Sequence, residues 1–128
     1  MISGKPMKIF VVDDDPSMLN LMGMLLEARG HEVILNHKGS SASVDIYDEM
    51  PDCLITDLIM PGLNGIELTR ELRDDPDTAS MKIIMVTSDT KEISRIKAVE
   101  AGVDAYIVKP LDPGTFAQTV EKVFWQTD

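Results

Sequence analysis

The chain has 128 residues, 44% of them hydrophobic, which is typical of a single domain that buries a core. Its formal net charge of -10 excludes a nucleic acid backbone as a main partner, because that role needs a basic surface. No apolar run reaches the roughly 18 residues that suggest a membrane span, and the only cysteine, Cys53, excludes an intramolecular disulfide. We therefore expect a cytoplasmic protein that contacts neither nucleic acid nor membrane.

Short apolar runs alternate with helix-length segments along the chain. The runs are rich in Val and Ile and predict strands buried on both faces, at residues 9–12, 33–35, 53–56, 83–86 and 106–108. Apolar stripes at helical spacing predict a helix after each strand, at residues 18–26, 40–50, 65–73, 93–99 and 116–124. The stripe of the fourth helix consists of Ile93, Ile96 and Val99. Residues 1–7 are predicted to be a short leader, and residues 8–128 a single domain with no output domain.

Five strands alternating with five helices predict an α/β fold with a parallel sheet covered on both faces. In such a sheet the ligand site lies beyond the carboxyl ends of the strands. The candidate site residues therefore follow the first, third, fourth and fifth runs: Asp13, Asp14, Asp57, Thr87 and Lys109. Carboxylates without a neighbouring His or Cys favour a hard cation with oxygen ligands, so the pattern predicts Mg2+ and not zinc.

Each candidate taken alone has a simpler interpretation. The aspartates at 13–15 would suit a helix N-terminus, Asp57 would suit a turn, and Lys109 would suit a solvated loop. Their coincidence at one edge of the sheet favours a functional site instead. Neither His31 nor His37 lies at a strand's carboxyl end, so both are expected at the surface.

These motifs resemble the receiver domain of bacterial two-component response regulators, in particular the stand-alone, chemotaxis-regulator-like type. The resemblance runs from Lys8 to about Phe124 and rests on VVDDDPS at 11–17, LITDLIMPGLNG at 54–65, VTS at 86–88 and YIVKP at 106–110. It implies a flavodoxin-like, doubly wound sheet of five parallel strands in the order 2-1-3-4-5, with five helices.

The resemblance also implies the chemistry. Asp57 would accept a phosphoryl group from a phosphohistidine of a sensor histidine kinase or a histidine phosphotransfer protein. Asp14, Asp57 and the backbone carbonyl of Ile59 would hold Mg2+ directly, and Asp13 would act through a water. Lys109 would pair with the phosphoryl oxygens.

The same resemblance implies a switch. The Thr87 hydroxyl would bond the arriving phosphoryl group, and Tyr106 would then move and change the face formed by the fourth helix, fifth strand and fifth helix. That face would dock to a downstream protein target. The chain would be a phosphorelay phosphoprotein and not an enzyme, apart from catalysing its own phosphorylation and dephosphorylation. It would be a monomer or a phosphorylation-dependent dimer.

Two residues depart from the common family pattern. Ile59 is apolar where many relatives carry a polar side chain two residues past the phosphoacceptor, and Ser88 stands where alanine or glycine is usual. The first departure bears on the lifetime of the phosphorylated state, and the second on the room beside Thr87.

Three other functions are less consistent with the sequence. A haloacid-dehalogenase-type phosphatase would use Asp13 as its nucleophile and Asp15 as its acid, but it leaves Asp57 and Lys109 unexplained. A flavin-binding module of the same fold would need a phosphate-binding loop rich in Gly, Ser and Thr after the first strand, and the sequence lacks one there. A receiver that works only as a phosphorylation-independent adaptor would not need the complete set of site residues.

Overall fold

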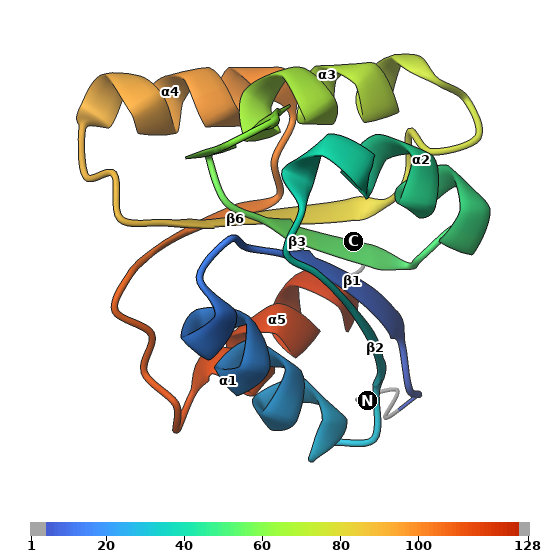
Figure 1. The fold of residues 1–128 in the computed structure, drawn as a ribbon, viewed down its shortest axis with the longest axis vertical. Helices are drawn as coiled ribbons and strands as arrows, with labels where there is room; N and C mark the ends of the chain where they lie inside the picture. The colour runs from blue at the N-terminus through green and yellow to red at the C-terminus, as the bar shows by residue number, and fades with distance from the viewer. Residues whose placement is uncertain (1–4, 126–128) are drawn as a thin grey trace.

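The computed structural model describes residues 5–125, which form one five-stranded parallel sheet with helices on both faces (Figure 1). The strand order is β2-β1-β3-β6-β7, which confirms the predicted doubly wound fold and its order. The strands are β1 (Lys8–Val12), β2 (Glu32–Asn36), β3 (Cys53–Thr56), β6 (Lys82–Thr87) and β7 (Ala105–Val108). The predicted fourth and fifth strands are thus β6 and β7.

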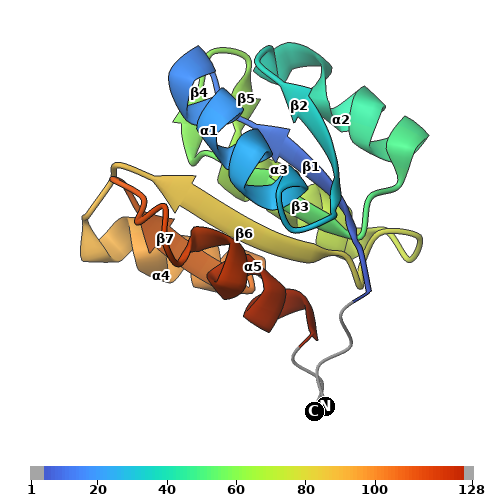
Figure 2. The same cartoon turned by 90° about the horizontal axis from the view of Figure 1, so that it is seen from below.

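Five helices form the two outer layers. They are α1 (Pro16–Glu27), α2 (Gly39–Glu49), α3 (Gly65–Asp74), α4 (Glu92–Ala101) and α5 (Phe116–Trp125). Helices α1 and α5 cover one face of the sheet, and α2, α3 and α4 cover the other (Figures 1 and 2). None of the helices within residues 5–125 has the length and apolar character of a membrane span.

A small hairpin that the sequence did not predict follows β3. It consists of β4 (Ile59–Met60) and β5 (Leu63–Asn64), which pair antiparallel. The turn between them is Pro61-Gly62, and Gly62 has a φ of 79°, a conformation that glycine adopts at little cost. The Pro-Gly pair was the available signal, but strands of two residues carry no hydrophobic period to detect.

The sheet is buried on both faces because its strands are apolar at successive positions. In β1, Ile9 and Val11 pack in the core below α1 and α5, whereas Phe10 and Val12 pack in the core below α2 and α3. Met7, assigned to the leader, belongs to the first of these cores and is only 2% exposed. Residues 1–4 of that leader and residues 126–128 of the predicted domain lie outside the described residues.

The apolar stripe of α4 does not face the core as an amphipathic pattern would suggest. Ile93, Ile96 and Val99 are 55%, 38% and 51% exposed, while Ala98 and Ala101 are the buried residues of the helix. Two alanines leave little apolar area for α4 to bury, so its larger apolar side chains remain available at the surface.

His31 is buried, contrary to the surface position expected from the sequence; His37 is exposed as expected. The Met7 backbone N–H donates to His31 Nδ1 (3.0 Å), so the proton of the neutral ring is on Nε2, which lies 2.7 Å from Glu121 Oε2. The prediction considered only the carboxyl edge of the sheet, whereas His31 precedes β2 at the opposite edge.

Glu121 on α5 also accepts hydrogen bonds from Arg29, beyond the end of α1, and the Nε contact is 2.9 Å long. The Arg29 guanidinium and, more weakly, His31 hold the pKa of Glu121 below its usual range, although burial opposes them. The cluster joins β1, β2, α1 and α5 at the amino edge of the sheet.

We expect Glu121→Ala to lower the free energy of unfolding by about 3 kcal/mol, because it leaves the buried His31 ring without its partner. Urea denaturation followed by circular dichroism measures the change. Glu100→Ala on the exposed side of α4 is the matched control and should change stability by less than about 0.5 kcal/mol. Equal effects of the two substitutions would contradict a structural role for the cluster.

Candidate functional site

The residues predicted for the site lie where the strands of the sheet end. Val12 pairs with Thr56 in the register of β1 and β3, so Asp13 and Asp57 leave neighbouring strands side by side. Thr87 ends β6, and Lys109 directly follows β7. The sheet therefore brings residues from four strands to one edge, as the sequence predicts.

Three carboxylates form a cluster at this edge. Each of Asp13, Asp14 and Asp57 offers an oxygen within 4.8 Å of the others. Asp13 is almost fully buried and accepts a hydrogen bond from the Asp15 backbone N–H (2.9 Å), and the Leu58 N–H donates to Asp57 Oδ1 (2.7 Å). These contacts fix the direction of both carboxylates.

The helix-capping interpretation applies to Asp15 alone among the three consecutive aspartates. Its Oδ1 accepts hydrogen bonds from the backbone N–H groups of Ser17 (3.0 Å) and Met18 (3.4 Å) at the start of α1. Asp13 accepts from the N–H of Asp15, ahead of the helix, and neither Asp13 nor Asp14 bonds a backbone N–H of α1 within the described residues, so capping does not account for them.

Lys109 supplies the positive charge of the site. Its ammonium lies 2.9 Å from Asp13 Oδ2 and 3.4 Å from Asp57 Oδ2. Burial by itself lowers the pKa of Lys109, but the contacts with the two carboxylates outweigh burial and raise that pKa above its ordinary value. Lys109 is therefore a permanent cation at neutral pH.

The donor set fits a magnesium ion. All three clustered side chains offer carboxylate oxygens, and one ammonium against three carboxylates leaves two negative charges uncompensated. The Ile59 side chain is 68% exposed beside this cluster, and the part assigned to its backbone carbonyl stays a prediction. Ser88 is also exposed, whereas Thr87 is buried.

Thr87 and Tyr106 converge on the peptide groups of Asp89 and not on the carboxylates. The Asp89 backbone N–H donates to Thr87 Oγ1 (3.2 Å), and the Tyr106 hydroxyl donates to the Asp89 carbonyl oxygen (2.9 Å). Burial raises the pKa of Tyr106, helped by the negative charges of Asp89 and Asp57, so the hydroxyl keeps its proton. The connecting role of Asp89 could not be predicted because it uses backbone atoms.

Gly65 is a second residue that the sequence interpretation missed. A Cβ atom at this position would overlap the backbone carbonyl oxygen of Asp57, and the Gly65 N–H donates to the Leu58 carbonyl (2.6 Å). Only glycine lets the start of α3 approach Asp57 so closely. The available signal in the sequence was a glycine directly after Asn64, the residue that caps the N-terminus of α3.

Comparison with known proteins agrees with this geometry. The sequence model of the response regulator receiver domain matches residues 9–121. The chain is 33% identical over 116 residues to protein PilH of Pseudomonas aeruginosa, covering 91% of this chain and 96% of PilH. It is 41% identical over 103 residues to the phosphate regulon transcriptional regulatory protein PhoB of Rhizobium meliloti, covering 80% of this chain but 45% of PhoB.

Solved structures agree as well. The chemotaxis response regulator CheY4 of Vibrio cholerae superposes with a TM-score of 0.85 at 26% identity, over 93% of this chain and 99% of CheY4. A CheY-like response regulator receiver domain protein from Methanospirillum hungatei superposes with a TM-score of 0.83 at 29% identity, over 93% of this chain and 94% of that one. The sequence motifs, the fold and the matched residues agree, and the chain belongs to the response regulator receiver domain family.

Proposed function

We propose that this receiver domain accepts a phosphoryl group on Asp57 from a phosphohistidine and transmits the signal by docking to a protein target. The donor is a sensor histidine kinase or a histidine phosphotransfer protein, and the setting is the cytoplasm. The arrangement that carries the proposal is the Lys109 ammonium between Asp13 and Asp57, beside an acidic cluster suited to Mg2+. The domain acts on no other substrate and catalyses only its own phosphorylation and dephosphorylation.

The side chains around Asp57 suit this reaction. The Leu58 N–H holds Asp57 Oδ1, which leaves Oδ2 on the side of Lys109 to attack phosphorus. A P–O bond to Asp57 forms as the P–N bond breaks, and the imidazole nitrogen keeps the electron pair. Lys109 then stabilises the phosphoryl oxygens. A magnesium ion held by Asp13, Asp14, Asp57 and the Ile59 carbonyl would neutralise further negative charge.

Asp89 offers a physical route from the phosphoryl group to the docking face. Thr87 Oγ1 accepts from the Asp89 N–H, so the hydroxyl still has its own proton to donate to a phosphoryl oxygen. A shift of Thr87 would move Asp89 and, through its carbonyl, Tyr106. Phosphorylation should therefore alter amide hydrogen exchange in α4 and β7, and unchanged exchange would contradict this switch.

The apolar surface of α4 supports docking at the face formed by α4, β7 and α5. The exposed side chains that contribute are Ile93, Ile96 and Val99, with Val108 at the end of the edge strand β7. Exposed apolar side chains grouped on one face favour contact with another protein.

The dehalogenase-type alternative is disfavoured by the geometry. Its nucleophile would be Asp13, which is 1% exposed and ion-paired with Lys109. Its acid would be Asp15, whose carboxylate caps α1. A phosphorylation-independent adaptor would use the same docking face. It differs from our proposal because its Asp57 would not become phosphorylated.

Asp57→Asn should abolish labelling by acetyl phosphate or phosphoramidate. The substitution keeps the shape of the side chain, leaves the Lys109 to Asp13 contact in place and relieves repulsion, so the variant should be slightly more stable than the wild type. Mass spectrometry of digested protein measures the label. Asp48→Asn, on the exposed side of α2, should label normally. Label on Asp13, or wild-type labelling of Asp57→Asn, would contradict the assignment.

Mg2+ should raise the melting temperature, because it binds the native site only. At about ten times the dissociation constant, which we expect to be millimolar or below, the gain is about 1.4 kcal/mol, or about 5 °C. Differential scanning calorimetry measures the response. Asp14→Ala should eliminate it, and Asp48→Ala should retain it. A wild-type melting temperature insensitive to Mg2+ would remove the metal from the proposal.

Ile59 should make the phosphorylated state long-lived, lasting minutes, because an apolar side chain cannot orient the attacking water. Ile59→Asn should speed the decay of the phosphoprotein about tenfold at saturating Mg2+. Val44→Asn, an equally exposed apolar residue on α2, is the control.

Asp89 is the other candidate for orienting that water, but its carboxylate oxygens already accept from the Lys91 N–H and the Ser94 hydroxyl (both 2.8 Å). Asp89→Ala should therefore change the decay rate little. Slower decay in Asp89→Ala together with an unchanged rate in Ile59→Asn would show that Asp89 controls the water.

A further inference from the structure

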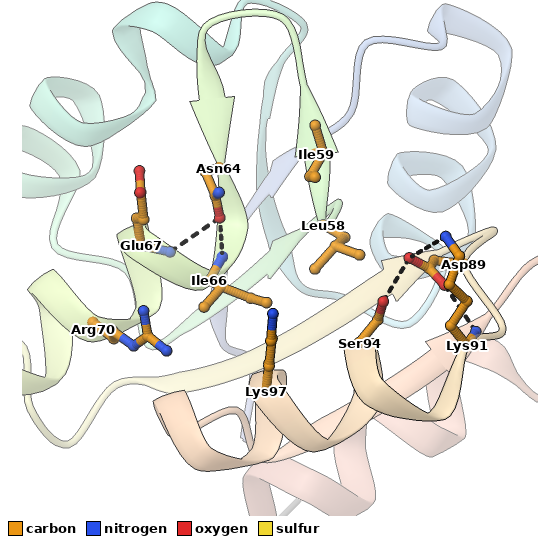
Figure 3. A pocket seen from close by; sticks show the side chains of 10 residues that line it. All are labelled: Leu58, Ile59, Asn64, Ile66, Glu67, Arg70, Asp89, Lys91, Ser94 and Lys97. Atoms are coloured by element: carbon orange, nitrogen blue, oxygen red, sulfur yellow. Dashed lines mark hydrogen bonds and ion pairs between the residues drawn. The ribbon is translucent and has the colours of Figure 1, made fainter.

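A cavity of about 420 Å³ lies between the β4–β5 hairpin, α3 and α4 (Figure 3). This volume is within the range of about 300 to 1,000 Å³ that is typical of small-molecule sites. Its apolar surface comes from Leu58, Ile59 and Ile66. The cavity is thus walled by three elements and has apolar side chains for a ligand to pack against.

Two cations on facing helices line this cavity. Arg70 belongs to α3 and Lys97 to α4, and neither makes an ion pair or side-chain hydrogen bond within residues 5–125. The Lys97 ammonium points from α4 toward Ile66, across the space between the helices (Figure 3). The Glu67 carboxylate points away from both cations in the same view, so it does not neutralise them.

The remaining charges near the cavity are already paired. Asp89 lies 3.9 Å from the Lys91 ammonium and accepts hydrogen bonds from the Lys91 N–H and the Ser94 hydroxyl. Much of the fold's positive charge is likewise used in ion pairs, namely Lys8 with Glu49, Arg29 with Glu121, Arg73 with Asp104, Arg95 with Glu92 and Lys109 with Asp13. Arg70 and Lys97 therefore carry positive charges that are not paired within residues 5–125, in a chain whose net charge is -10.

We propose that this cavity binds a small organic anion. The ligand has an apolar body that packs against Leu58, Ile59 and Ile66, and one carboxylate, phosphate or sulfonate group that contacts Arg70 and Lys97. The limited volume favours a small molecule over a segment of a partner protein. The proposal does not depend on phosphorylation of Asp57, because none of these contacts involves the acidic cluster.

The test compares two probes that share an aromatic body. The probe 8-anilino-1-naphthalenesulfonate carries a sulfonate, and N-phenyl-1-naphthylamine does not; both fluoresce when they enter an apolar site. Arg70→Gln and Lys97→Gln should each weaken binding of the sulfonate probe about threefold to tenfold and leave the uncharged probe unaffected. Lys122→Gln on α5 removes the same charge outside the cavity and should change neither affinity.

Amide chemical shifts of the labelled full chain then locate the sulfonate probe. Shifts grouped at residues 58–59, 66–70 and 94–97 support the proposal. Shifts centred on the exposed stripe of Ile93, Ile96 and Val99 would place the probe on the outer face of α4 and overturn it. No measurable binding, or an equal loss of affinity in Lys122→Gln and Lys97→Gln, would also overturn it.

Discussion

The contact of Lys109 with Asp13 and Asp57 makes the carboxyl edge of this sheet possible. Two like charges about 4 Å apart repel by roughly 4 kcal/mol at an effective dielectric constant of 20, and three carboxylates meet here within 4.8 Å. The ammonium, at 2.9 Å and 3.4 Å from two of them, offsets part of that repulsion. Because Asp13, Asp57 and Lys109 follow β1, β3 and β7, the site forms only when β1, β3, β6 and β7 have assembled.

The balance of positive and negative side chains differs between the two edges of the sheet. At the amino edge, Glu121 is matched by Arg29 and His31, so its charge is satisfied and the cluster serves stability. At the carboxyl edge, the negative charge exceeds the positive charge, which is unfavourable for stability but suits a cation, and such a cation would in turn offset the charge of a phosphoryl group. Under the proposed function, this surplus is the physical reason why the phosphoryl chemistry lies at the second edge.

The sequence predicted the features that depend on the order of strands and helices along the chain and on the spacing of apolar residues. Parallel strands must end at one edge, so the meeting of Asp13, Asp57 and Lys109 followed from the apolar runs alone. It could not predict contacts that depend on tertiary packing: the burial of His31 needs α5 to bring Glu121 from 90 residues away. The outward face of α4 was also missed, because helical spacing identifies a stripe but not the side that meets the sheet.

Asp89 ties α4 to the carboxyl edge through both its backbone and its side chain. Its peptide groups bond Thr87 and Tyr106, while its carboxylate holds the Lys91 N–H and the Ser94 hydroxyl at the start of the helix. A displacement of Asp89 would therefore be transmitted to the start of α4 through the Lys91 and Ser94 hydrogen bonds. Ser94 also lines the cavity between α3 and α4. Ser94 therefore connects the carboxyl edge of the sheet, through Asp89, with the wall of that cavity.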